Sequence, residues 1–181
     1  MRAGQYASVN RDPWRSFLAV ALLAGVAAGC ATAERIDAAG DVHALMIAIR
    51  DDDRASFEAH VDRAALEQEL EARILARTGA TDSSDAVRTL GAVLARPLSR
   101  LAGEALIRPQ VFRDVAEFYG YTPAKPLPSQ FTIAAALRSL PDGRVCAAKK
   151  KGGPCLITFA NEQGVWRLVS FDGDVAMLRL P

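Results

Sequence analysis

Hydrophobic residues recur at spacings of three and four through residues 41–140, and this period predicts amphipathic helices. The first stripe, which begins at Val42, follows Asp41, and we expect this aspartate to cap the helix. Asp53 is expected to cap a second, short helix with Phe57 and Val61 facing inward. Further helices are predicted over 62–79 and 109–120, with Gly79 and Gly120 as their stops, and over 85–106. A last helix is predicted over 129–140 with Ser129 as its cap, and a strand is the alternative there.

The predicted helix over 85–106 has an apolar stripe and an internal proline. Pro97 lacks a backbone donor, so this helix is expected to kink or restart there. In the helix before it, Glu69 and Arg73 are spaced to form a favourable ion pair. The apolar positions of the stripe are Val87, Leu90, Leu94, Leu98, Leu101 and Leu106.

After Pro141-Asp142-Gly143 the hydrophobic pattern changes to short runs rich in β-formers. The runs are RVCAAK, CLITFA, VWRLVSF and VAMLRL, separated by KGGP, NEQG and DGD turns. This spacing predicts an antiparallel β-meander over 144–180. Helices followed by strands indicate a single α+β domain over 41–181, with the helices on one face of the sheet.

The N-terminus has the pattern of a secretion signal. Three arginines precede an uncharged run of thirteen residues, FLAVALLAGVAAG. Signals have an apolar middle of about 7–15 residues, whereas a spanning helix needs about 20. We therefore expect residues 1–29 to be a signal peptide.

The run ends in Ala27-Ala28-Gly29-Cys30, which resembles the lipobox of bacterial lipoproteins. Its usual leucine is replaced by Ala27. The resemblance implies that Cys30 is acylated, with palmitate-type chains, and that residues 30–40 form a polar tether. Because alanine rather than aspartate follows Cys30, the resemblance favours an anchor in the outer membrane, with the domain facing the periplasm. Cleavage after Ala31-Thr32-Ala33, which would discard Cys30, is the alternative.

Without residues 1–29, the 22 basic and 21 acidic residues become 19 and 20, a net charge of −1. Such a balance gives no electrostatic basis for binding nucleic acid. The composition therefore indicates one ordinary-sized domain. The lipid anchor that the lipobox resemblance implies makes the membrane a partner, and another envelope protein is a further candidate.

Lipidation of Cys30 would leave Cys146 and Cys155 as a pair on either side of KKKGGP. A hairpin would bring them opposite each other in an oxidising compartment, which predicts a disulfide. Two buried free thiols are the alternative. A metal site is not expected, because no further ligands have suitable spacing.

The remaining candidates for function are few. Lys149, Lys150 and Lys151 are expected to form a solvated turn, and the functional alternative is contact with anionic lipid headgroups or a polymer. Tyr119 and Tyr121 are candidates for the mouth of a cavity.

No catalytic constellation is recognised. His43 and His60 lack converging partners, and Asp51-Asp52-Asp53 lacks the ligand spacing of a calcium loop. Nucleophile and phosphate-loop motifs are absent. We expect neither catalytic residues nor a cofactor.

Several segments together resemble a known family. They are LMIAIRDDD, an Asp-x-x-x-Leu-x-x-x-Leu segment, ALIRPQVF and the terminal LITFANEQGVWRLVSF. Their order is similar to the small bacterial envelope proteins known as domain of unknown function twenty-nine thirty-nine, over residues 40–172. The Cys146/Cys155 pair and a longer linker depart from that pattern.

That family has no established activity and transfers no functional residues. Helices before a curved sheet are also similar to cystatin-like and nuclear-transport-factor-like cone folds, an analogy of fold alone. We therefore expect a non-enzymatic, membrane-anchored interaction or accessory module. The alternative is a carrier that holds a small apolar ligand or lipid between helices and sheet.

Overall fold

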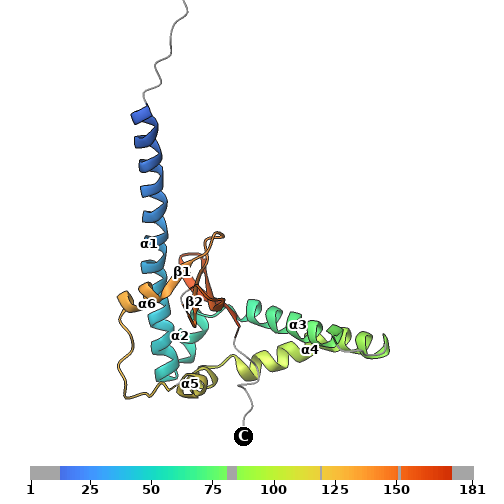
Figure 1. The fold of residues 1–181 in the computed structure, drawn as a ribbon. Coiled ribbons are helices and arrows are strands. Elements are labelled where there is room, and N and C mark those ends of the chain that lie inside the picture. Colours follow the sequence, from blue (N-terminus) through green and yellow to red (C-terminus); the bar gives the residue numbers. More distant parts are fainter. Residues whose placement is uncertain (1–12, 81–84, 119, 151, 173–181) are drawn as a thin grey trace, which may run out of the picture. The chain divides into compact units, whose positions relative to one another are not determined.

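The computed structural model describes residues 13–80, 85–118, 120–150 and 152–172 (Figure 1). The chain divides into two compact units, Met1–Ala33 and Glu34–Pro181. The described part of the first unit is helical. Within the described ranges, no helix combines the length and the hydropathy needed to cross a membrane.

The second unit contains helices followed by strands, which confirms the predicted α+β class. The first helix of the chain, α1, extends into this unit and ends at Asp51. The elements are α1 (Pro13–Asp51), α2 (Arg54–Ala59), α3 (Arg63–Ala80), α4 (Asp85–Leu106), α5 (Pro109–Phe118), α6 (Gln130–Ala136), β1 (Leu137–Ser139), β2 (Val145–Ala148), β3 (Cys155–Glu162) and β4 (Val165–Phe171).

The strands form an antiparallel sheet in the order β1-β2-β3-β4, a simple meander. Val145 pairs with Phe159, and Phe159 pairs in turn with Leu168. The outer edge of β4 is covered by the link between α2 and α3, where Val61 forms a parallel bridge with Leu168. The predicted strand VAMLRL lies outside the described residues.

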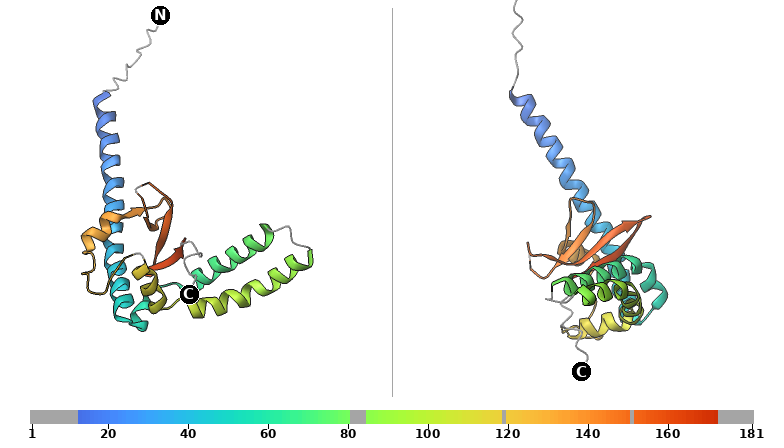
Figure 2. Two further views of the ribbon diagram at one scale, coloured as in Figure 1. Left: turned by 60° about the horizontal axis from the view of Figure 1, so that its bottom comes forward. Right: turned by 90° about the vertical axis from the view of Figure 1, so that its right-hand side faces the viewer.

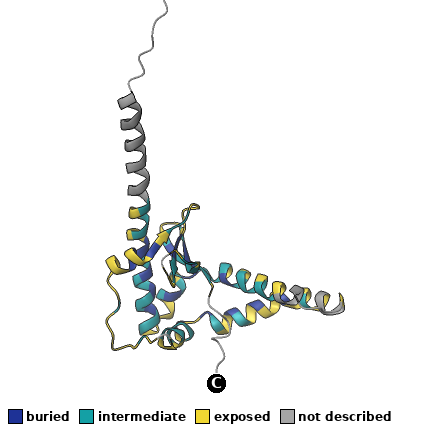
Figure 3. Ribbon diagram, in the orientation of Figure 1, coloured by how far each residue is buried: buried dark blue, intermediate teal, exposed yellow. Residues whose placement is uncertain are grey.

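One face of the sheet packs against the helices and forms the core (Figure 3). Small alanines on α1 allow the helix to approach the sheet closely, and Ala38 and Ala39 have no exposed surface. The larger core side chains are Val42, Leu45, Phe57, Val61, Leu66, Ile107, Ile133, Leu137, Val145, Phe159, Trp166 and Leu168.

The predicted polar tether before Asp41 is corrected by the structure. Asp41 lies inside α1 rather than at an N-cap, and the compact unit begins at Glu34. The reason is that residues 31–40 contain alanines, which are strong helix formers, and two of these alanines are buried in the core.

Two smaller expectations differ from the structure, and a third is narrowed by it. Gly79 does not stop α3, which runs to Ala80. Pro97 lies inside α4, so the helix does not restart there, and a kink at this residue stays a prediction. The segment 129–140 is divided between the two alternatives, because α6 changes at Leu137 into β1. Leu137 enters the core as a strand residue paired with Ala147.

The predicted caps around the short helices are confirmed. The Asp53 carboxylate accepts a hydrogen bond from the Ser56 amide at 3.1 Å. The Ser129 hydroxyl accepts one from the Thr132 amide at 3.3 Å. Gly120 follows α5 with a φ of 86°, a conformation that glycine adopts without strain.

Candidate functional site

The long helix α4 presents its leucines to solvent instead of to a partner helix. Leu90, Leu94, Leu98 and Leu101, which we call the leucine face, are all exposed (Figure 3). The opposite side of α4 carries small residues that are buried, namely Ala95, Ser99 and Gly103.

Those small residues allow α3 and α4 to pack closely, side by side, as both views in Figure 2 show. A Cβ atom at Gly103 would come within 2.7 Å of the Glu67 side chain. Arg63 donates hydrogen bonds to the carbonyls of Gly103 and Ile107 at 3.1 and 3.0 Å. The guanidinium thereby adds a positive charge and hydrogen bonds at carbonyls around the C-terminal end of α4.

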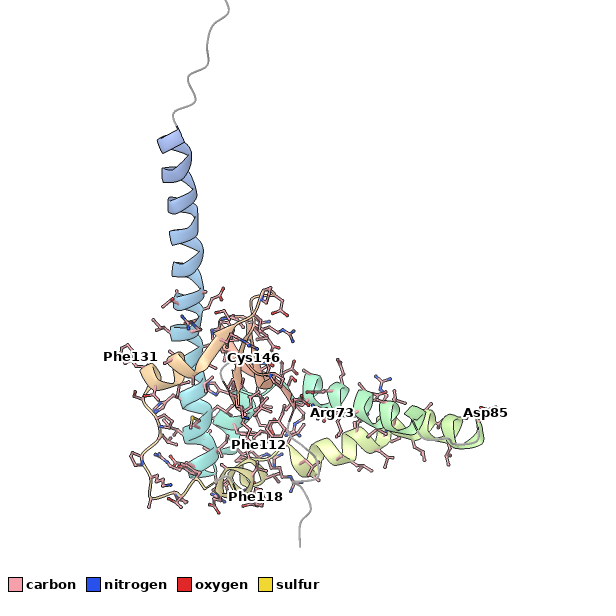
Figure 4. All side chains as sticks on the ribbon, in the orientation of Figure 1. Arg73, Asp85, Phe112, Phe118, Phe131 and Cys146 are labelled. Carbon is pink, nitrogen blue, oxygen red and sulfur yellow. A yellow bond between two sulfur atoms is a disulfide. The ribbon has the colours of Figure 1, made fainter. Side chains whose placement is uncertain are left out.

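Helix α3 is fixed to the end of β4 by a second arginine (Figure 4). Arg73 donates to Glu69 at 2.6 Å, which confirms the predicted ion pair, and also to the Phe171 carbonyl at 2.9 Å. The Phe171 amide donates to the second oxygen of Glu69 at 3.2 Å. These bonds hold α3 against the end of β4.

A polar cluster joins α1 to β4. The Trp166 indole donates to Asp37 at 2.8 Å, and its amide donates to Asp41 at 2.8 Å. The His60 ring contacts the Ser56 carbonyl at 2.8 Å through Nδ1 and lies 3.6 Å from Asp41 through Nε2. Trp166 is almost fully buried and belongs to the core cluster.

The acidic run Asp51-Asp52-Asp53 takes part in local hydrogen bonds and an ion pair. Across the described part of the chain, no three His, Cys, Asp or Glu side chains are grouped in a way that could hold a metal ion. Asp51 pairs with Arg50, and this hydrogen bond lowers the pKa of the Asp51 carboxyl. Asp52 accepts from Gln110 at 2.6 Å, while the bond from Ser56 lowers the pKa of Asp53.

Among the described residues, the carboxyl of Glu162 has a raised pKa. Burial raises the pKa of Glu162, and the nearby Asp62 adds to this effect. Arg167, 3.4 Å from Glu162, opposes it. Glu162 and Asp62 thus meet where the end of β3 lies next to the start of α3.

The predicted disulfide joins Cys146 to Cys155 on neighbouring strands, with Cα atoms 5.7 Å apart. The two cysteines are not directly opposite, because Cys146 pairs with Thr158 and Cys155 with Ala148. Arg138 donates from β1 to both sulfurs, at 3.6 and 3.2 Å.

The β2–β3 connection between these two cysteines carries the predicted lysines. Lys149 and Lys150 are exposed, and Lys151 lies outside the described residues. Figure 3 shows that the β2–β3 connection extends toward the end of α1 where the second unit begins. Cys30 lies in the part of α1 that belongs to the first unit, and its side chain is outside the described part.

The predicted tyrosine pair is only partly described. Tyr121 is half-buried, and its buried hydroxyl has no hydrogen-bond partner. Tyr119 lies outside the described residues.

Sequence reasoning did not find the outward direction of the leucine face. A leucine stripe is the usual mark of a buried helix face. The small residues Ala95, Ser99 and Gly103, which recur at every fourth position, were the signal that identifies the packed side of α4.

No curated protein and no solved structure matches the chain. A family model described as "Protein of unknown function (DUF2939)" matches residues 19–115. This match begins in the apolar N-terminal run and ends in α5, so it leaves out the sheet that the resemblance over 40–172 had included. Because the match covers more than half of the chain, the chain belongs to this family of proteins of unknown function.

Proposed function

We propose that this chain is an exported, lipid-anchored protein of the bacterial envelope whose compact unit is a non-enzymatic interaction module. The observation that carries the interaction role is the leucine face, which α4 exposes although α3 packs on the same helix. Exposed apolar patches of this kind mark interaction sites. The signal-like N-terminus and a disulfide, typical of oxidising compartments, support export.

The packing of the second unit favours a module over the alternative, a carrier. Large side chains such as Phe57, Phe159 and Trp166 fill the space between the helices and the sheet. An apolar ligand held there would have to displace these core residues.

Lipidation of Cys30 would hold the module close to the membrane. Glu34, where the compact unit begins, is four residues from Cys30, a reach of about 14 Å at most in extended chain. The end of the module that contains Glu34 would therefore lie at the membrane surface.

Cys30→Ala is expected to abolish anchoring, because several acyl chains are needed for stable membrane attachment and all depend on this sulfur and the new N-terminus. In fractionated cells the wild-type chain stays with the membranes, and the variant becomes soluble or stays unprocessed. Ala31→Ser, the matched control, remains with the membranes. A Cys30→Ala variant with unchanged fractionation and mobility would refute the anchor.

The lysines of the β2–β3 connection are proposed to contact anionic headgroups. The β2–β3 connection, which carries the exposed Lys149 and Lys150, extends toward the Glu34 end of the module (Figure 3). Each basic residue near such a surface contributes about 1 kcal/mol.

Replacing Lys149, Lys150 and Lys151 together with Gln, in the Cys30→Ala chain, is expected to weaken binding to phosphatidylglycerol vesicles by about tenfold or more. Lys125→Gln serves as the control, because Lys125 is exposed but lies between α5 and α6, outside the β2–β3 connection. Equal vesicle binding by the triple variant and its parent would rule out this contact.

A further inference from the structure

The leucine face is large enough to be the centre of a protein interface. Its four side chains are 42–65% exposed. Together they present roughly 400 Å² of apolar surface, and the largest patch on a typical monomer is about 300–600 Å². A standard interface buries about 800 Å² per partner, of which a little over half is apolar. The leucine face supplies most of that apolar share.

The charge of the helical pair does not favour a lipid surface as the occupant. Residues 63–106 contain six arginines and six acidic residues. Helices that lie on anionic membranes are instead rich in lysine and arginine on their polar side. A helical pair with balanced charges around an apolar face fits a protein partner better than an anionic membrane.

The spacing of the leucines makes the face complementary to itself. Leu90 and Leu101 are eleven residues apart, about 16 Å along the helix. If two copies of α4 pair antiparallel about a two-fold axis that crosses the leucine face midway between Leu94 and Leu98, Leu90 meets the partner's Leu101 and Leu94 meets the partner's Leu98. The antiparallel arrangement also opposes the two helix dipoles favourably.

We propose that the leucine face binds the leucine face of a second copy of this chain, in an antiparallel and closed two-fold dimer. The inference deepens the proposed function, on which it rests, by naming the first partner of the module. The α3 helix, held by Arg63 and Arg73, keeps the small-residue side of α4 covered and leaves the leucines free for this contact.

The mass of the full-length protein in detergent, measured by light scattering, tests the proposal. The wild-type chain is expected at twice its protomer mass. Leu94→Glu/Leu98→Glu is expected to raise the dissociation constant by about a hundredfold or more, because dimerisation would strip water from four carboxylates. Both positions are exposed in the single chain, so the circular dichroism spectrum should not change.

Arg96→Glu/Arg100→Glu is the matched control, because both residues are exposed but lie off the leucine face. This variant stays dimeric. A wild-type monomer across the micromolar range would overturn the proposal, as would a Leu94→Glu/Leu98→Glu variant that stays dimeric or loses only vesicle binding.

Cysteine cross-linking in cells tests the orientation independently of any folding effect. One tagged copy carries Leu90→Cys and a differently tagged copy carries Leu101→Cys. The mixed pair is expected to cross-link more than either like pair, and Thr89→Cys, which lies on the flank of the helix, is the control. Preferred like pairs, or no cross-link, would overturn the antiparallel dimer. A monomer that still fractionates with membranes would leave the anchor unaffected.

Discussion

Phe57→Ala is expected to lower the free energy of unfolding by about 3–5 kcal/mol, the usual cost of removing a buried aromatic ring. Phe57 has no exposed surface and forms an edge contact with Phe112, with ring centroids 5.3 Å apart. The ring connects α2 to α5 and to the core. Since whole domains are stable by only about 5–15 kcal/mol, much of the variant should unfold at growth temperature.

Urea unfolding followed by circular dichroism measures this loss. Phe131→Ala is the matched control, because Phe131 is 81% exposed on α6 and its removal should change stability by less than about 0.5 kcal/mol (Figure 4). Equal midpoints for the two alanine variants would show that α2 is not part of the core.

Trp166→Ala is expected to cost a similar amount, about 3–5 kcal/mol, for a partly different reason. Trp166 is 3% exposed in the core, and its indole also joins β4 to α1 through Asp37. Asp37→Ala removes only the hydrogen bond and should cost about 0.5–1.5 kcal/mol. Comparing the two variants by urea unfolding separates packing from hydrogen bonding. A larger loss in Asp37→Ala than in Trp166→Ala would contradict the assignment of Trp166 to the core.

The local chemistry of short segments made several features of the fold predictable. Asp53 and Ser129 cap helices because their side chains reach amides three residues ahead, an interaction contained within a few residues. The change from helical to strand period gave the α+β class, and the spacing of Cys146 and Cys155 gave the disulfide.

Features that depend on distant contacts were not predictable in this way. Ala38 and Ala39 are buried in a stretch of α1 that Trp166 of β4 joins by hydrogen bonds to Asp37 and Asp41. In isolation, residues 31–40 instead resemble a tether. Leu137 is a strand residue because β2 pairs with it. The direction of the leucine face depends on α3, which covers the small-residue side of α4.

We propose that Cys30 becomes the lipid-modified N-terminus of an envelope protein. Intact mass spectrometry of the chain purified from membranes is the decisive test of this proposal. The expected chain begins at Cys30 and carries the added mass of a diacylglyceryl group and its acyl chains. A chain that begins at Glu34 without added lipid, or one that retains residues 1–29, would contradict it.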